Sequence, residues 1–185
     1  MKWILVLLLF TGLACNQPVK KADDTKEKIE RIDWNTTKIN GLLPMIINVQ
    51  QVTNRLGKPD SIVKPDHDIT DSFYRNKMTY YYVKGLTYEK YHDTLVFKRI
   101  DFTKDTVDNL IWSKLKFDHT STMSYFAKVF PSSSNNELRG TDIDKYRIFG
   151  LDDPENGNRR SGWMFCFNEN GSKILWIDHY VADRE

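Results

Sequence analysis

The sequence predicts an α+β fold of two helix-plus-antiparallel-meander units, with the helices packed on one face of the sheet. A short, clearly bounded helix pattern occurs twice, and runs rich in β-branched and aromatic residues follow each one. Aromatic residues make up 13% of the 185 residues, which favours strands and a substantial core. We therefore expect residues 32–185 to form one α+β domain. Its halves, 32–117 and 118–185, are weakly similar, which favours an internal duplication.

The first predicted helix begins after Asn48, a residue that commonly caps helix N-termini. Val49, Val52 and Leu56 fall on one apolar stripe at helical spacing. Gly57 follows and is a typical residue just beyond a helix C-terminus, and a proline comes two residues later. This segment is expected to be a short helix that packs on the sheet.

Three runs after this helix are predicted to be strands. They cover residues 77–83, 93–102 and 107–117, and each is rich in β-branched and aromatic residues. Loops that contain glycine or aspartate separate them. Their spacing indicates an antiparallel meander.

The pattern then restarts with a second short helix. Ser121 or Thr122 is expected to cap it, and an apolar stripe runs through Phe126 to Phe130. Pro131 ends it, because proline cannot continue a helix. A strand over 144–151 should follow.

The last two predicted strands, 161–167 and 172–181, are joined through an Asn-Gly pair that favours a tight hairpin turn. Aligning them through that turn places Trp163 and Phe165 on the same face as Trp176. Both faces of this hairpin are apolar, although an antiparallel sheet usually exposes one face to water. Either other elements cover both faces, or one face meets a partner.

The run Tyr80-Tyr81-Tyr82 raises the same alternative. Tyr80 and Tyr82 share one face of their strand, where exposed tyrosines make good anchors for a protein or a sugar. Packing in the core is the competing interpretation. The candidate binding surface therefore consists of Tyr80, Tyr82, Trp163, Phe165 and Trp176.

The N-terminus begins MKWILVLLLFTGLACNQP. Lys2 precedes an apolar run over 4–10, which is shorter than the roughly 20 apolar residues of a spanning helix and is typical of a secretory signal. Small residues then lead into Cys15. This stretch resembles the lipobox of bacterial lipoproteins, although Gly12 stands where that motif usually has leucine. A plain signal peptide that contains a cysteine is the alternative.

The lipobox resemblance implies that residues 1–14 are a removed signal peptide. Cys15 would become the acylated N-terminus of the mature chain, and several acyl chains on one residue hold a protein firmly on a membrane. Residues 15–31 are polar and of mixed charge, so they are expected to be a flexible tether. The implied location is the cell envelope of a Gram-negative-type bacterium, on the periplasmic side or at the cell surface. Cys166, in an apolar run, is expected to be a small buried residue.

The segment VTNRLGKPDSI, followed by a tyrosine-rich strand and a meander, resembles the helix and Leu-Gly-x-Pro turn of small envelope lipoproteins of the SmpA/BamE type. It also resembles the β-lactamase-inhibitor-protein-like fold. The resemblance covers 49–102. The sequence departs from these proteins in its second half and in having NGLLPM before the first helix. The resemblance implies helices on one face of an antiparallel sheet and a role in binding proteins without catalysis.

Composition and motifs argue against several other functions. With 27 basic and 25 acidic residues, the chain lacks the basic excess of a nucleic-acid-binding protein. No catalytic motif or metal-ligand spacing occurs, so we expect no catalytic residue, no metal site and no cofactor. The four histidines are not spaced as a metal pair; they are His67, His92, His119 and His179.

The sequence therefore predicts a lipid-anchored envelope lipoprotein that acts as a non-enzymatic protein-binding or assembly module. Its expected partners are the membrane, through the N-terminal lipid, and another envelope protein, with no nucleic acid. Two alternatives remain open. One is a periplasmic inhibitor or immunity-type lipoprotein, and the other is a sugar-binding surface lipoprotein.

Overall fold

The computed structural model describes residues 30–65, 78–104, 109–138, 145–153 and 159–183. Cys15, the predicted signal peptide, His67 and most of the expected tether lie outside these residues. Within them, no helix has the length and the apolar composition needed to cross a membrane.

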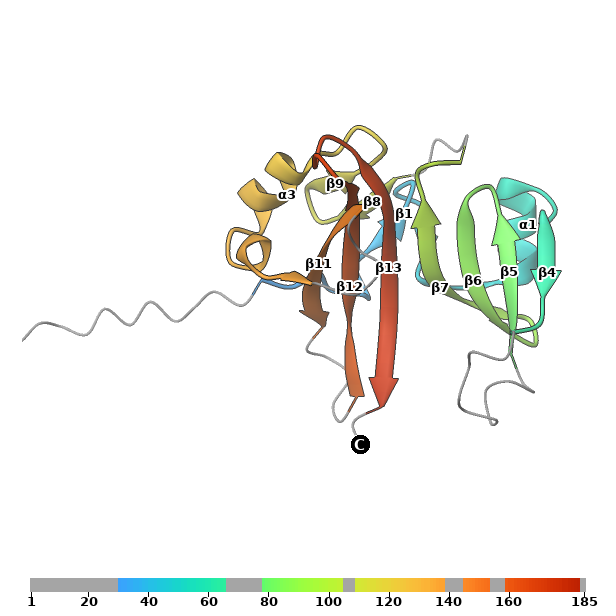
Figure 1. The fold of residues 1–185 in the computed structure, drawn as a ribbon. Coiled ribbons are helices and arrows are strands. Elements are labelled where there is room, and N and C mark those ends of the chain that lie inside the picture. Colours follow the sequence, from blue (N-terminus) through green and yellow to red (C-terminus); the bar gives the residue numbers. More distant parts are fainter. Residues whose placement is uncertain (1–29, 66–77, 105–108, 139–144, 154–158, 184–185) are drawn as a thin grey trace, which may run out of the picture.

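Antiparallel strands dominate the described chain (Figure 1). The strands are β1 (Lys38–Ile39), β2 (Leu43–Pro44), β3 (Ile46–Asn48), β4 (Ser61–Val63), β5 (Thr79–Val83), β6 (Leu86–Tyr91), β7 (Thr94–Asp101), β8 (Leu110–Trp112), β9 (Leu115–Phe117), β10 (Glu137–Leu138), β11 (Tyr146–Asp153), β12 (Arg159–Asn168) and β13 (Ile174–Asp183). The described α-helices are α1 (Val49–Leu56) and α3 (Met123–Val129), and a 3₁₀ turn, η1, spans Ser133–Asn135.

Most strands belong to one nine-stranded sheet, called the long sheet below. Its order is β10-β11-β12-β13-β7-β6-β5-β4, and β3 pairs with β7 beside this path. A second, four-stranded sheet has the order β2-β1-β8-β9. Figure 1 shows α3 and α1 beside opposite ends of the long sheet.

The predicted α+β class of two helix-plus-meander units is wrong, because the protein is a β-rich fold. The α-helices in the described residues are only eight and seven residues long, whereas β12 and β13 have ten residues each. In addition, β13 pairs with β7, so strands from 32–117 and from 118–185 form one sheet. The internal duplication stays a prediction.

The helix α1 begins where the sequence predicts. The Asn48 side chain accepts a hydrogen bond from the N–H of Gln50, and the side chain of Gln51 accepts one from the N–H of Asn48. This reciprocal capping satisfies N–H groups that the first helical turn leaves free. The helix buries Val52 and lies against β5, where Thr53 Oγ1 is 3.3 Å from the hydroxyl of Tyr81.

The helix α3 buries one phenylalanine in a cluster of aromatic rings. The Thr122 side chain accepts the N–H of Tyr125 and caps the helix. Phe126 is fully buried, and its ring centroid lies 5.0 to 5.8 Å from those of three phenylalanines on β11 and β12. These are Phe149, Phe165 and Phe167. Burial of this much aromatic surface holds the short helix on the sheet.

The core continues from one end of the long sheet to the other. Phe97 on β7 packs against Tyr88 on β6, and its ring also lies 6.2 Å from that of Trp163 on β12. Trp34, which precedes β1, contacts both Phe97 and Trp163. The described core is therefore a single cluster.

The last hairpin has a register that differs from the predicted one. Phe167 pairs with Ile174, and a bulge then leaves Leu175 as an extra residue in β13. Its carbonyl accepts the N–H of Phe102 instead. Beyond the bulge every side chain of β13 changes face, so Trp176 pairs with Cys166. The prediction that Trp176 shares a face with Trp163 and Phe165 is therefore wrong.

Candidate binding face of the long sheet

The described helices α1 and α3 pack on one face of the long sheet, and the opposite face carries the candidate site. Tyr81, Phe97 and Ile177 point toward the helical side and are buried. Side chains alternate along strands, so their neighbours project from the opposite face. We call this opposite face the open face; the residues that matter below are Tyr80, Tyr82, Glu89, Arg99, Met164, Cys166, Trp176 and Asp178.

The long sheet consists of two runs of strands, β10 to β13 and β7 to β4, which join where β13 pairs with β7. An ion pair lies at this junction. The guanidinium of Arg99 on β7 donates from Nε and Nη2 to the two carboxylate oxygens of Asp178 on β13, at 2.5 and 2.6 Å. The side chain of Asp178 is 6% exposed and that of Arg99 is 45% exposed. The hydrogen bond to Asp178 raises the pKa of Arg99, although burial opposes this effect. One partner is therefore buried and the other reaches solvent.

The same guanidinium lies 5.3 Å from the ring centroid of Trp176, within the range of a cation–π contact. Trp176 is half-buried, and its ring also meets that of Tyr146 edge-on at 5.3 Å. Tyr146 is 39% exposed. The position of Arg99 is thus fixed by the carboxylate of Asp178 and the indole of Trp176.

Tyr80 and Tyr82 project from the open face of β5 and are half-buried. Their ring centroids are 6.3 Å apart. Burial, and then the negative charge of Glu89, raises the pKa of Tyr80, so its hydroxyl stays neutral and can donate a hydrogen bond at neutral pH. The charge of Arg99 also acts on Tyr80, in the opposite direction. The structure therefore brings Tyr80, Tyr82 and Trp176 to one face, with Arg99 between them.

Trp163 and Phe165, the other two predicted surface residues, lie in the core. Both are fully buried on the helical side of β12. The indole Nε1 of Trp163 donates to the carbonyl of Ile32 at 3.1 Å, and the ring of Phe165 packs against Phe126. Their assignment to a binding surface is corrected, because no partner can reach them in the folded protein.

Arg99 and Asp178 were missed by the sequence analysis. An aspartate inside the apolar run LWIDHY is a signal that a buried carboxylate needs a cationic partner. The identity of that partner depends on β13 pairing with β7, and no local pattern predicts this pairing. Tyr146 was missed because a single tyrosine at the start of a strand carries no distinctive pattern.

Cys166 is fully buried under the open face, which confirms the expected small buried residue. Burial, and then the charge of the neighbouring Asp178, raises the pKa of its thiol to about 12. The thiolate is the reactive form of cysteine, so this thiol is unsuited to nucleophilic attack at neutral pH.

His179 is buried on the helical side of β13. Its ring centroid lies 3.9 Å from that of Trp34 and 5.0 Å from that of Trp163. Burial, and then the charge of Lys98, lowers its pKa to about 3. The imidazole is therefore neutral at physiological pH and packs as an aromatic ring.

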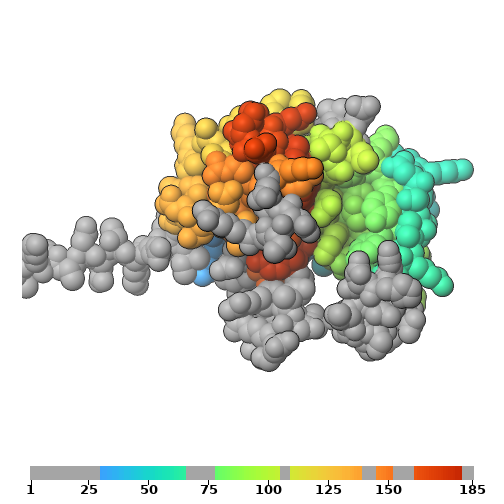
Figure 2. Space-filling view, viewed as in Figure 1, coloured from blue at the N-terminus to red at the C-terminus, as the bar shows by residue number. Residues whose placement is uncertain are grey.

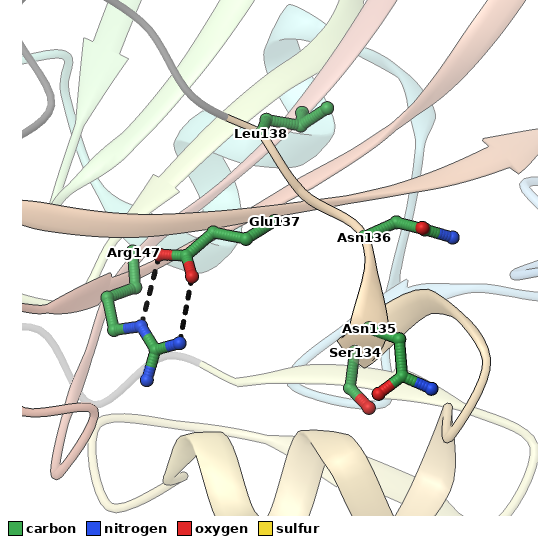
Figure 3. Close-up of a pocket in the computed structure, with 6 residues that line it drawn as sticks. All are labelled: Ser134, Asn135, Asn136, Glu137, Leu138 and Arg147. Carbon is green, nitrogen blue, oxygen red and sulfur yellow. Dashed lines mark hydrogen bonds and ion pairs between the residues drawn. The ribbon is translucent and has the colours of Figure 1, made fainter.

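An open pocket of about 560 Å³ lies at the η1 end of the molecule (Figure 3). Glu137 and Arg147 point toward each other there and form two hydrogen bonds of 3.0 and 2.8 Å. The side chains of Ser134 and Asn135 both donate to the carbonyl of Pro131. These polar groups hold the turn and the sheet edge together, so the pocket offers little convergent chemistry to a ligand.

No group of three or more histidine, cysteine, aspartate or glutamate side chains suited to a metal ion occurs in the described part of the chain. In comparisons with known proteins, the chain matches no family model, no curated protein and no solved structure. The geometry of the open face is therefore the basis for a functional argument.

Proposed function

We propose that this chain is a lipid-anchored envelope lipoprotein that acts as a non-enzymatic protein-binding or assembly module and meets its partner through the open face. The observation that supports the proposal is the row of Tyr80, Tyr82, Arg99 and Trp176, which are partly exposed on one sheet face. Tyrosine, tryptophan and arginine are the residue types that most often dominate the binding energy of protein interfaces.

The arrangement of the row suits binding. Arg99 is held by Asp178 and by the ring of Trp176, so it loses little conformational freedom when a partner binds. Beside it, Lys98 and Glu89 form an ion pair at 3.6 Å, in which both side chains are partly exposed. A central group of rigid aromatic and arginine side chains with charged neighbours is the usual composition of a protein-binding site.

The orientation of the rings favours a protein over a sugar. Sugar platforms need aromatic rings that lie flat beside one another along the surface. Here the planes of Tyr80 and Tyr82 are inclined by 54°, and those of Tyr146 and Trp176 by 71°. Irregular rings of this kind fit the side chains of a folded partner better than the flat faces of successive sugars.

The N-terminal segment provides the proposed link to the membrane. Acylated Cys15 would hold the protein at the bilayer, and the polar residues that follow would act as the tether. Glu30 is bound to the folded domain, because its two carboxylate oxygens accept hydrogen bonds from the N–H groups of Ser132 and Ser133. Ile32 is fully buried soon after it. The tether would therefore enter the domain near η1.

Affinity purification tests this proposal. The tagged, natively lipidated protein is cross-linked mildly in cells, and the proteins captured are identified by mass spectrometry. A Tyr80→Ala/Trp176→Ala variant should lose a stoichiometric envelope partner. Leu42→Ala, which truncates a residue that is 63% exposed and lies in the turn between β1 and β2, is the matched control and should retain it.

A Cys15→Ser variant separates anchoring from binding. It should leave the membrane fraction while its purified domain keeps its affinity for the captured partner. Equal capture by the open-face variant and the wild type would contradict the assignment of the binding site. A captured toxin-like enzyme whose activity falls on binding would favour the inhibitor or immunity alternative.

A further inference from the structure

The edge strand β4 offers a second surface, distinct from the open face. Among the described strands β4 pairs only with β5, so it is the last strand on that side of the long sheet. All three of its residues are exposed, and Ile62 and Val63 keep 51% and 48% of their surface accessible. Figure 2 shows this segment, in teal, at the right-hand margin of the molecule. An exposed apolar edge strand is a template for pairing with another strand.

The sequence around β4 is complementary to itself. When two copies run antiparallel with Ile62 opposite Ile62, Ser61 of each copy faces Val63 of the other. Asp60 then faces Lys64 at both ends of the pairing. Opposite charges on facing residues stabilise a strand pair. A twofold-symmetric interface needs this property, because the same surface must meet itself.

Other registers are less favourable. Moving the pairing by two residues in one direction brings Lys58 opposite Lys64 and Asp60 opposite Ile62. Moving it by two in the other direction places Ile62 opposite Lys64. A shift of one residue sets the open face of one copy beside the helical face of the other, because side chains alternate along a strand. The charges therefore favour the register centred on Ile62.

The ends of the strand also fit a short, bounded pairing. Pro59 and Pro65 flank the segment, and neither has a backbone N–H to extend a ladder. A lysine at a sheet edge usually discourages pairing, but in this register Lys64 meets a carboxylate. Two hydrogen bonds hold Asp60 in place. Its Oδ2 accepts the backbone N–H of Lys84 at 2.7 Å, and its own backbone N–H donates to the carbonyl of Tyr82.

We propose that two copies of this chain associate through antiparallel pairing of β4, centred on Ile62. The long sheets of the two copies then join edge to edge with both open faces on the same side. Only a few residues pair, so the interface is small and the association is weak and reversible in dilute solution. This inference does not depend on which protein binds the open face.

Disulfide trapping tests the register in the natively lipidated protein on membranes. With Ile62→Cys, the two cysteines face each other with Cβ atoms about 5 Å apart, and mild oxidation should produce a covalent dimer. Val63→Cys is the matched control, because its Cβ atoms would be about 7 to 8 Å apart, beyond disulfide reach. The parent protein without an added cysteine should stay monomeric on a non-reducing gel. Comparable trapping of Val63→Cys and Ile62→Cys would overturn the register.

A charge reversal tests the ion pairs. In the Ile62→Cys background, Lys64→Glu places like charges opposite each other at both ends and should slow dimer formation about tenfold. Lys38→Glu makes the same change in net charge at an exposed residue of β1, in the four-stranded sheet, and should leave the rate unchanged. Equal effects of these two substitutions would show that net charge, and not this pairing, controls the association. Sedimentation of the detergent-solubilised wild type should show a concentration-dependent dimer that Ile62→Asp abolishes; a strictly monomeric wild type would contradict the proposal.

Discussion

Arg99 on β7 and Asp178 on β13 form a forked ion pair across the line where the two runs of strands meet. The pair is the most buried of the described salt bridges, judged by the 6% exposure of the carboxylate. The two residues are 79 positions apart in the sequence. The same arginine is also part of the proposed binding face. One side chain therefore connects β7 to β13 and contributes to the candidate site.

Removing the arginine should destabilise the protein more than removing a surface lysine. Arg99→Met leaves the buried carboxylate of Asp178 without its cationic partner and should lower the free energy of unfolding by about 2 to 3 kcal/mol. Lys98→Met breaks the more exposed pair with Glu89 and should cost less than about 1 kcal/mol. Urea unfolding measures both values. A double Arg99→Met/Asp178→Leu variant should recover part of the loss, because it leaves no unpaired charge; failure to recover any would argue against this explanation.

Stability should fall as the pH decreases below 7 because of His179. Its pKa is lowered to about 3 in the folded protein, so the unfolded chain takes up a proton first as the pH falls through the unperturbed value of 6.5. Stability is then fully present above pH 6.5 and decreases toward the folded pKa. The loss between pH 7 and pH 5 should be about 2 kcal/mol. Chemical denaturation at several pH values measures this slope.

His179→Phe provides the control for this pH dependence. The substitution retains an aromatic ring beside Trp34 but removes the titratable group. The pH dependence between 7 and 5 should become nearly flat, whatever the change in absolute stability. A slope identical to that of the wild type would assign the effect to other groups.

Cys166 should resist thiol reagents in the folded protein. Burial and a pKa raised to about 12 leave very little thiolate at pH 8. In a Cys15→Ser background, labelling by an aromatic disulfide should be about a thousandfold slower than in denaturant. Rapid, complete labelling under native conditions would show that this part of β12 opens readily.

Phe126→Ala should show that the protein unfolds as one unit. The substitution empties a fully buried site between four phenylalanine rings and should cost about 3 to 5 kcal/mol. Ser124→Ala, an exposed change on the same helix, should have little effect. Because the long sheet and its core are continuous, the loss should appear equally in tryptophan fluorescence and in far-ultraviolet circular dichroism. Two separate transitions would indicate that the two runs of strands fold independently.

The local elements could be predicted because their signals are local. Asn48 caps α1 and Thr122 caps α3, as their positions before apolar stripes indicate. Strands β5 and β7 also lie within predicted runs. The strand β6 was missed, since Glu89 and Lys90 interrupt its apolar pattern, and the run over 107–117 is two strands joined by a turn at Ser113.

The architecture depended on features that are not local. One bulged residue, Leu175, reverses the faces of the last strand, and nothing in its identity indicates this. The pairing of β13 with β7 joins residues far apart in sequence and converts two expected units into one sheet. Of the predicted surface, Tyr80, Tyr82 and Trp176 lie on the open face, whereas Trp163 and Phe165 lie in the core. Trp176 lies on the face opposite to Trp163 and Phe165 because of the bulge in this hairpin.

The contacts that residues 30–34 make with the rest of the domain have a mechanical consequence. A pull on the chain before Glu30 would be transmitted first to the N–H groups of Ser132 and Ser133, at the start of η1. It would then reach the indole of Trp163 through the carbonyl of Ile32. Trp34 follows, and its ring contacts those of Phe97 and His179. In the proposed lipid-anchored protein, force from the membrane would therefore act on the centre of the core through three successive contacts, before it reached the outermost strands.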